Sequence, residues 1–153
     1  MQIIKAKPGQ AQEISDLIKE VVNEVLARTG DYDDFEIGEW LKRTTAEAIE
    51  EKMQSREIFV AVEGEKIIGT IALENQRILG FYIKKELQGK GIGTEMLKFV
   101  ENYAKENKFG KLDMTSTPIA VEFYKKRGYE DLGKVRVKLG EAIMTETKLE
   151  KQL

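Results

Sequence analysis

The spacing of apolar residues predicts four helices in this chain. In residues 11–27, apolar side chains recur every three or four positions, which is the stripe of an amphipathic helix. The TTAE segment at residues 44–47 fits a capping box and predicts a second helix. A third helix is predicted directly after the glycines at 89–93. A fourth begins at the Thr-Pro pair of residues 117–118, because proline suits the first position of a helix.

Seven shorter apolar runs predict β-strands. The second and third runs flank a Glu-Gly-Glu turn, which predicts an antiparallel hairpin. Strands and helices therefore follow one another in a mixed order with several hairpins, which favours a mixed α/β (α+β) fold over a doubly wound parallel sheet. With 153 residues, we expect a single domain over residues 1–153. The seven runs lie at residues 2–6, 57–62, 66–73, 78–83, 111–116, 134–139 and 142–149.

Composition narrows the functions that this chain can have. The 25 basic and 27 acidic residues are interspersed and give a net charge of −2, which does not resemble a nucleic-acid-binding surface. There are no cysteines and no histidines, so we expect no thiolate or histidine-dependent catalysis and no metal site. No segment approaches 18 consecutive apolar residues, so we expect no membrane partner and a cytoplasmic location.

Three glycines at alternate positions, Gly89, Gly91 and Gly93, lie between an apolar run and a helix-forming run. A strand that passes through a glycine-rich turn into a helix N-terminus is suited to bind an anion, because the first helical N–H groups have no partner there. Lys90 can add positive charge and Thr94 a hydroxyl. The alternative is a strand–helix turn that needs glycine only for its backbone angles. The P-loop and dinucleotide-binding patterns do not fit, since Gly91 follows Lys90 and Thr94 replaces the third glycine.

The QGKGIG segment at residues 88–93 resembles the (Gln/Arg)-x-x-Gly-x-(Gly/Ala) signature of the GNAT superfamily of N-acetyltransferases. Residues 117–133, TPIAVEFYKKRGYEDLG, resemble that family's second cofactor segment, and the order of elements matches over nearly the whole chain. The resemblance implies a mixed, mostly antiparallel sheet of about seven strands flanked by four helices. It also implies acetyl-CoA as the co-substrate, with its pyrophosphate at the glycine turn.

The resemblance further implies which residues contact acetyl-CoA. The pantetheine arm would pair with the backbone of residues 81–83, and the Ile83 N–H would be the oxyanion donor. Members of the family often have Asn near Thr117, so Thr117 either contacts the cofactor or only caps the next helix, and the Thr-Pro sequence favours the cap. The implied cofactor-binding residues are Phe81, Tyr82, Ile83, Gln88, Gly89, Lys90, Gly91, Ile92, Gly93, Thr94, Thr117 and Tyr124.

Three residues are candidates for acid–base catalysis. Tyr124 aligns with the tyrosine that protonates the CoA thiolate in many members of the family, although a purely core role is the alternative and Phe123 fits that role better. Glu74 and Asp113 are the carboxylates expected to face the cleft as the general base. Either could instead be an ordinary strand-end acid, and a chain of water molecules could replace it.

The segment between the first two predicted helices, residues 31–40, is the candidate acceptor site. Its carboxylates, including Asp31 and Glu36, could attract a cationic amine, and its aromatic residues, including Trp40, could form walls. A solvated acidic loop is the alternative. The residues expected to bind the acceptor are Tyr32, Asp33, Asp34 and Phe35.

The function implied by the resemblance is acetyl-CoA-dependent N-acetylation of a primary amine on a small molecule or peptide, by direct attack in a ternary complex. The alternative is a non-catalytic sensor of acyl-CoA with the same fold. Tyr124 and the complete glycine turn favour turnover, because a sensor needs no proton donor. A third class, a phosphate-binding domain unrelated to CoA, would leave FYKKRGY unexplained. No nucleic-acid partner is expected, and a homodimer is compatible with the sequence.

Overall fold

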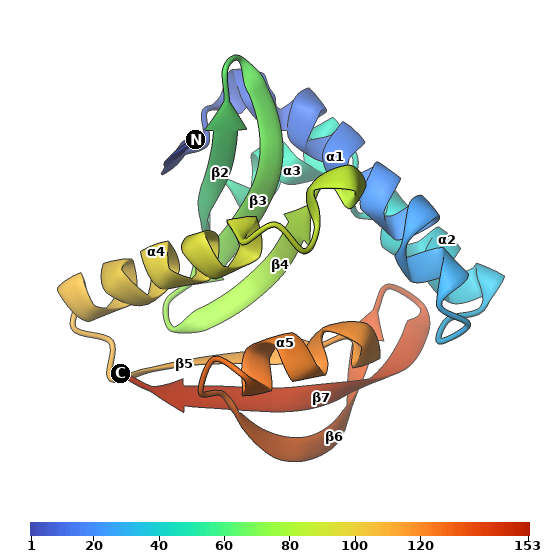
Figure 1. The fold of residues 1–153 in the computed structure, drawn as a ribbon. Helices are drawn as coiled ribbons and strands as arrows, with labels where there is room; N and C mark the ends of the chain where they lie inside the picture. The colour runs from blue at the N-terminus through green and yellow to red at the C-terminus, as the bar shows by residue number, and fades with distance from the viewer.

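A seven-stranded mixed sheet forms the centre of the protein, and the computed structural model describes all residues from 1 to 153 (Figure 1). The strand order is β1-β2-β3-β4-β5-β7-β6, and every neighbouring pair is antiparallel except β4 and β5. The predicted mixed, mostly antiparallel sheet is therefore confirmed. The strands are β1 (Gln2–Lys5), β2 (Glu57–Glu63), β3 (Lys66–Glu74), β4 (Arg77–Ile83), β5 (Lys111–Ser116), β6 (Glu130–Leu139) and β7 (Ala142–Gln152).

Five α-helices flank the sheet, one more than the sequence predicts. The additional helix lies in the acidic segment, where Asp33 caps the N-terminus by accepting a hydrogen bond from the Glu36 N–H at 2.8 Å. The Glu36 carboxylate accepts from the Asp33 N–H in return, which completes a capping box. The helices are α1 (Ala11–Glu24), α2 (Asp34–Lys42), α3 (Ala46–Lys52), α4 (Ile92–Glu106) and α5 (Val121–Lys125). None is long and apolar enough to cross a membrane.

The sheet separates two hydrophobic cores. Alternation along β2 shows this clearly, because Ile58 and Val60 pack into the core under α1, α2 and α3, whereas Phe59 and Ala61 pack into the core under α4 and α5. Both sets of side chains are buried to within 5% exposure. Figure 1 shows α4 and α5 together in front of the sheet, with α1 and α3 behind its upper half.

The parallel junction between β4 and β5 is held at one end only. Arg77 and Asp113 are its single register pair, and the Arg77 Nε donates to the Asp113 carboxylate at 2.9 Å. Farther along β4 the register to β3 shifts by one residue near Gly80, whose φ of +76° is natural only for glycine. This bulge turns β4 away from β5, and the two strands diverge toward their C-terminal ends (Figure 1).

A buried carboxylate braces the two halves of the sheet. Glu101 of α4 is only 9% exposed and accepts hydrogen bonds from Lys151 Nζ of β7 at 3.0 and 3.2 Å. The Tyr129 hydroxyl donates to the same carboxylate at 3.2 Å. Because α4 packs on the half containing β3 and β4, these contacts fix it to the strand pair β5–β7 on the other half.

Removing the cation from this brace should destabilise the protein. In Lys151→Met the Glu101 carboxylate stays buried without its charged partner, and we expect the free energy of unfolding to fall by about 1–3 kcal/mol. Lys125→Met is the control, because its ion pair with Glu122 is exposed and should contribute less than about 1 kcal/mol. Urea denaturation of both variants measures the difference. Equal losses in the two variants would show that the brace adds nothing.

Candidate active site

In the turn between β4 and α4, the backbone N–H groups are accessible to a ligand. Gly89 and Gly91 have φ of +77° and +88°, and a Cβ added at either residue would meet no atom within 4 Å. Gly91 is the N-cap of α4 and has no side chain to bond the first helical N–H groups. An anion with several oxygens can therefore approach these donors and the positive end of the helix dipole.

Gly93 and Thr94 face α5 in the structure, and their contact with the cofactor stays a prediction. A Cβ added at Gly93 would lie 3.2 Å from the ring of Phe123, so this glycine permits the close approach of the two helices. The Thr94 hydroxyl accepts from the Arg127 guanidinium at 2.7 and 3.0 Å, and the same guanidinium lies 3.8 Å above the Phe123 ring. Arg127 was not predicted. The sequence feature that could have indicated it is its position directly before Gly128, in the turn that follows α5.

The free edge of β4 lies beside this turn. The Lys84 N–H donates to the Ile68 carbonyl of β3 at 2.9 Å, so the alternation of an extended strand directs the N–H groups of Ile83 and Phe81 away from β3. The Gln88 side chain donates to the Ile83 carbonyl at 3.0 Å and thereby joins the turn to this edge. The structure thus brings together the predicted strand residues and the predicted glycine turn.

Tyr124 lies where β4 and β5 diverge. It is 6% exposed, and its ring contacts Phe81, Phe123 and Tyr129 at centroid distances between 5.2 and 6.4 Å. Burial raises the pKa of its hydroxyl, and the nearby Tyr82 and Glu146 raise it further, so the group keeps its proton at neutral pH. The expectation that Phe123 is the more buried ring was wrong, because Phe123 is half-buried beneath Arg127.

Glu146 of β7 is a carboxylate that the sequence reasoning missed. Its Oε1 accepts a hydrogen bond from the Thr115 hydroxyl at 3.0 Å, and burial raises its pKa above the ordinary value for glutamate. Its negative charge helps to raise the pKa of the hydroxyls of Tyr32, Tyr82 and Tyr124. Period-two alternation could have identified it, because Glu146 shares its strand face with the buried Met144.

The two predicted bases lie at the other end of the junction. Glu74 is exposed at the β3–β4 turn, where its register partner is Arg77. Asp113 is 7% exposed and is held by the guanidinium of the same arginine. The structure therefore places both carboxylates where β4 and β5 are joined and does not bring them together with Tyr124.

The acidic segment contributes one wall of a hollow of about 410 Å³. Asp31, Tyr32 and Glu36 line it, whereas Asp33 caps α2 and the Phe35 side chain is 57% exposed outside the lining. Asp34, in the first turn of α2, is also exposed and outside the lining.

Two contacts of Trp40 connect this wall to Tyr82 of β4. The Trp40 Nε1 donates to the Tyr82 hydroxyl at 3.0 Å, and its ring packs edge-on against Tyr32 at 5.4 Å. Burial raises the pKa of Tyr82 to about 12. The Tyr32 hydroxyl is buried and has no hydrogen-bond partner.

Thr117 does not cap a helix through its hydroxyl. The chain after it forms a short 3₁₀ turn, Pro118–Ala120, before α5, and no side-chain capping bond is made. Thr117 holds the predicted N-cap position before Pro118 but forms no side-chain capping bond, and its carbonyl accepts from the Ser116 hydroxyl at 2.9 Å. Its contact with the cofactor stays a prediction.

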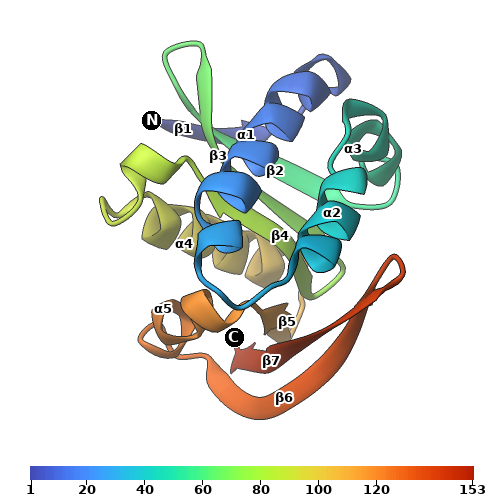
Figure 2. The ribbon, with the colours of Figure 1, turned by 90° about the vertical axis from the view of Figure 1, so that its right-hand side faces the viewer.

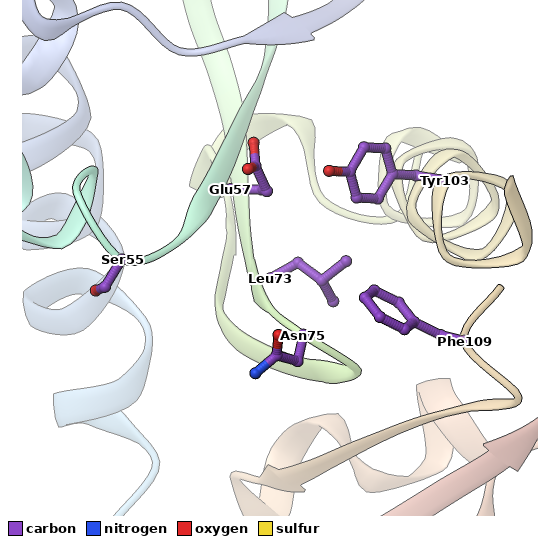
Figure 3. A pocket seen from close by; sticks show the side chains of 6 residues that line it. All are labelled: Ser55, Glu57, Leu73, Asn75, Tyr103 and Phe109. Atoms are coloured by element: carbon purple, nitrogen blue, oxygen red, sulfur yellow. The ribbon is translucent and has the colours of Figure 1, made fainter. Parts of the chain in front are cut away.

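A second hollow, of about 160 Å³, lies near the joined end of the sheet (Figure 3). Tyr103 and Phe109 point into it from the end of α4 and the segment that follows. Its single carboxylate, Glu57, is paired with Lys5 at 2.7 Å. This hollow brings no acid–base pair together, and no cluster of three or more possible metal ligands occurs anywhere in the structure.

Comparison with known proteins identifies the family. Residues 28–145 match the family described as the acetyltransferase (GNAT) domain. The chain belongs to the GNAT acetyltransferase family. It is 38% identical over 69 residues to an uncharacterized N-acetyltransferase from Methanocaldococcus jannaschii. That match covers 42% of this chain and 44% of the relative, so it spans less than half the length of either protein.

Solved structures share the fold over the whole length of this GNAT protein. A GCN5-related N-acetyltransferase from Rhodopseudomonas palustris superimposes with a TM-score of 0.91 at 18% identity, covering 99% of this chain and 95% of the other. The PaiA N-acetyltransferase of Thermoplasma acidophilum, solved in complex with coenzyme A, gives 0.82 at 19% identity, covering 99% and 98%. At these identities the similarity establishes the shared fold.

Proposed function

We propose that this GNAT protein transfers the acetyl group of acetyl-CoA to a primary amine of a small molecule or peptide. The observation that carries the proposal is one continuous arrangement: the open glycine turn, the free edge of β4, and a protonated tyrosine and a partly buried carboxylate at its end. The complex of the similar PaiA enzyme with coenzyme A supports this choice of co-substrate.

The residues present suit acetyl-CoA. Open space at Gly89 and Gly91 leaves room for a diphosphate against the first N–H groups of α4. The outward N–H and carbonyl of Phe81, together with the second lone pair of the Ile83 carbonyl, can pair with the amides of the pantetheine arm, as an added strand would. The Ile83 N–H can then stabilise negative charge that develops on the thioester oxygen.

Glu146 and Tyr124 divide the proton transfers between them. The amine attacks only as the neutral base, and Glu146, whose pKa is raised by burial, can take its proton. As the C–N bond forms and the C–S bond breaks, Tyr124 donates its proton to the leaving thiolate and is reprotonated from solvent. The chain has no cysteine to carry an acetyl group, which supports direct attack in a ternary complex.

Charge substitutions at Gly91 test the cofactor site. Glu, Gln and Lys at this position share the strain of a side chain at φ +88°, so differences among them report charge. A carboxylate about 8 Å from a phosphate charge, at an effective dielectric constant of about 20, costs about 2 kcal/mol, or about 30-fold in affinity. We expect acetyl-CoA to bind Gly91→Glu about 30-fold more weakly than Gly91→Gln, and Gly91→Lys most tightly of the three.

Calorimetric titration with acetyl-CoA measures these affinities, and equal values in the three variants would refute a diphosphate at the turn. A thiol-release assay with a panel of amines then separates an enzyme from an acyl-CoA sensor. The sensor binds acetyl-CoA but releases no CoA thiol with any amine, whereas the enzyme releases it in an amine-dependent way.

A further inference from the structure

The hollow beside Glu146 has walls of opposite charge. Asp31 and Glu36 line it from the segment joining α1 to α2, and Lys134 and Arg136 line it from β6. Figure 2 shows that segment crossing above the β6–β7 hairpin, with α5 beside them. At about 410 Å³ the hollow has the size of a small-molecule site.

The protein leaves these charges unpaired. None of its ion pairs involves Lys134 or Arg136, and none involves Asp31, Glu36 or Glu146. Opposite charges are thus held on two sides of a hollow without neutralising one another. A ligand that carries both charges can pair with both walls, whereas a simple amine or a polycation would leave the basic wall unpaired.

Strand register separates the two charged regions of the hairpin. Lys134 and Arg136 pair with Thr147 and Thr145, so their side chains follow one face of the hairpin. Glu146 pairs with Val135 and points to the other face, where it meets Thr115. The hollow thus reaches Glu146 on one face and the two cations on the other, so a ligand that meets both needs a spacer between its amine and its anion.

A further group in the hollow lacks a partner. Tyr32 lines it, and the Tyr32 hydroxyl is buried without a hydrogen bond. Buried polar groups are rarely left unsatisfied, so a polar ligand atom at this position would complete the site.

We infer that the acceptor is a zwitterion: a primary amine, placed at Glu146, joined by a spacer to a carboxylate or phosphate that Lys134 and Arg136 bind. The inference rests on the proposed N-acetyltransferase function and narrows its substrate class to ω-amino acids and aminoalkyl phosphates. The acidic wall still attracts the ammonium group, and the basic wall selects the amines that also carry an anion.

Matched amines test this selection in the thiol-release assay with the full-length protein. We expect kcat/KM for 5-aminovalerate or for 3-aminopropyl phosphate to exceed that for pentylamine and for cadaverine by about tenfold, since a hydrogen bond to a charged group typically contributes about that much. Comparing the carboxylate with the phosphate shows which anion the basic wall prefers. Equal kcat/KM for all four amines, or a preference for cadaverine, would overturn the inference.

Substitutions of Lys134 and Arg136, the basic wall, test whether these two residues cause the preference for zwitterionic amines. Arg136→Gln and Lys134→Gln should each raise KM for the preferred zwitterion about tenfold and leave KM for pentylamine and for acetyl-CoA unchanged. Lys138→Gln is the matched control, because it follows the same strand face but lies outside the hollow. A loss confined to Lys138→Gln, or equal effects on zwitterion and pentylamine, would contradict the assignment.

A binding measurement separates this inference from the proposed function. Calorimetric titration of the CoA-saturated protein with 5-aminovalerate, 3-aminopropyl phosphate and pentylamine needs no turnover. If neither zwitterion binds more tightly than pentylamine, the inference fails even when amines are acetylated. If a zwitterion binds selectively but no amine releases thiol, the acetyltransferase proposal fails and the zwitterion site stands.

Discussion

Glu146→Gln is expected to lower kcat/KM for the amine by about 100-fold or more, because general bases typically contribute about 10²- to 10⁴-fold. Glutamine keeps the size of the side chain and an oxygen that can still accept from the Thr115 hydroxyl. The variant therefore removes the base with little change in packing. Steady-state thiol release with the best amine of the panel measures the loss.

The pH dependence distinguishes this role from a structural one. Burial raises the Glu146 pKa, so activity should fall on the acid side at a pH above the ordinary glutamate value, and Glu146→Gln should lose that limb. A raised carboxyl pKa stabilises the fold below the unfolded-state pKa, and this contribution is lost as pH rises through the folded-state value. At neutral pH the glutamine variant should thus be no less stable than the wild type.

The same assay compares the other candidate bases. Glu74→Gln and Asp113→Asn should keep most of the catalytic activity, because both carboxylates lie at the joined end of β4 and β5. If Glu146→Gln keeps full activity and either Glu74→Gln or Asp113→Asn loses activity, the general base is the carboxylate removed in that variant. Asp113→Asn also weakens the pairing with Arg77, so its thermal stability must be measured alongside its rate.

Tyr124→Phe should lower kcat by about 100-fold, the low end for a general acid, because a thiolate is a good leaving group. The ring and its aromatic contacts remain, so the affinity for acetyl-CoA and the Tm should change little. Calorimetry and thiol release under chemistry-limited conditions separate the two quantities.

Tyr129→Phe is the matched control for Tyr124→Phe. It also removes one buried hydroxyl, but that hydroxyl donates to Glu101 rather than facing the cleft. We expect it to lower stability by about 1 kcal/mol and to leave kcat unchanged. A normal kcat in Tyr124→Phe would mean that solvent or the substrate protonates the thiolate.

Features of this protein that depend on neighbouring residues could be predicted from the sequence, and features that depend on distant packing could not. The strands follow from local alternation, and the glycine turn from six contiguous residues. The helix at α2 was missed because its Asp33–Glu36 capping box lies in an acidic, aromatic segment without a clear apolar stripe. Alternation along β7 could have marked the face of Glu146, but its contact with Thr115, 31 residues away, depends on how β5 and β7 pack.

Two expectations at the fourth predicted helix differ from the structure, for separate reasons. The Thr-Pro pair suggested a side-chain cap, but the chain after Thr117 forms the 3₁₀ turn Pro118–Ala120, and no side-chain capping bond is made there. Phe123 is the more apolar of two adjacent rings, yet Arg127 covers it from outside and Tyr124 takes the inner position. Hydrophobicity alone cannot rank neighbouring aromatic residues when a cation stacks on one of them.

The divergence of β4 and β5 gives this sheet two more edges than its strand order suggests. The outer edges of β1 and β6 carry unpaired backbone groups, and a strand of another molecule can pair with such groups, which promotes aggregation. The two inner edges face one another across a narrowing gap that Arg77 and Asp113 close at one end. The unpaired backbone groups of the inner edges therefore face another strand of the same sheet, unlike those of the outer edges of β1 and β6.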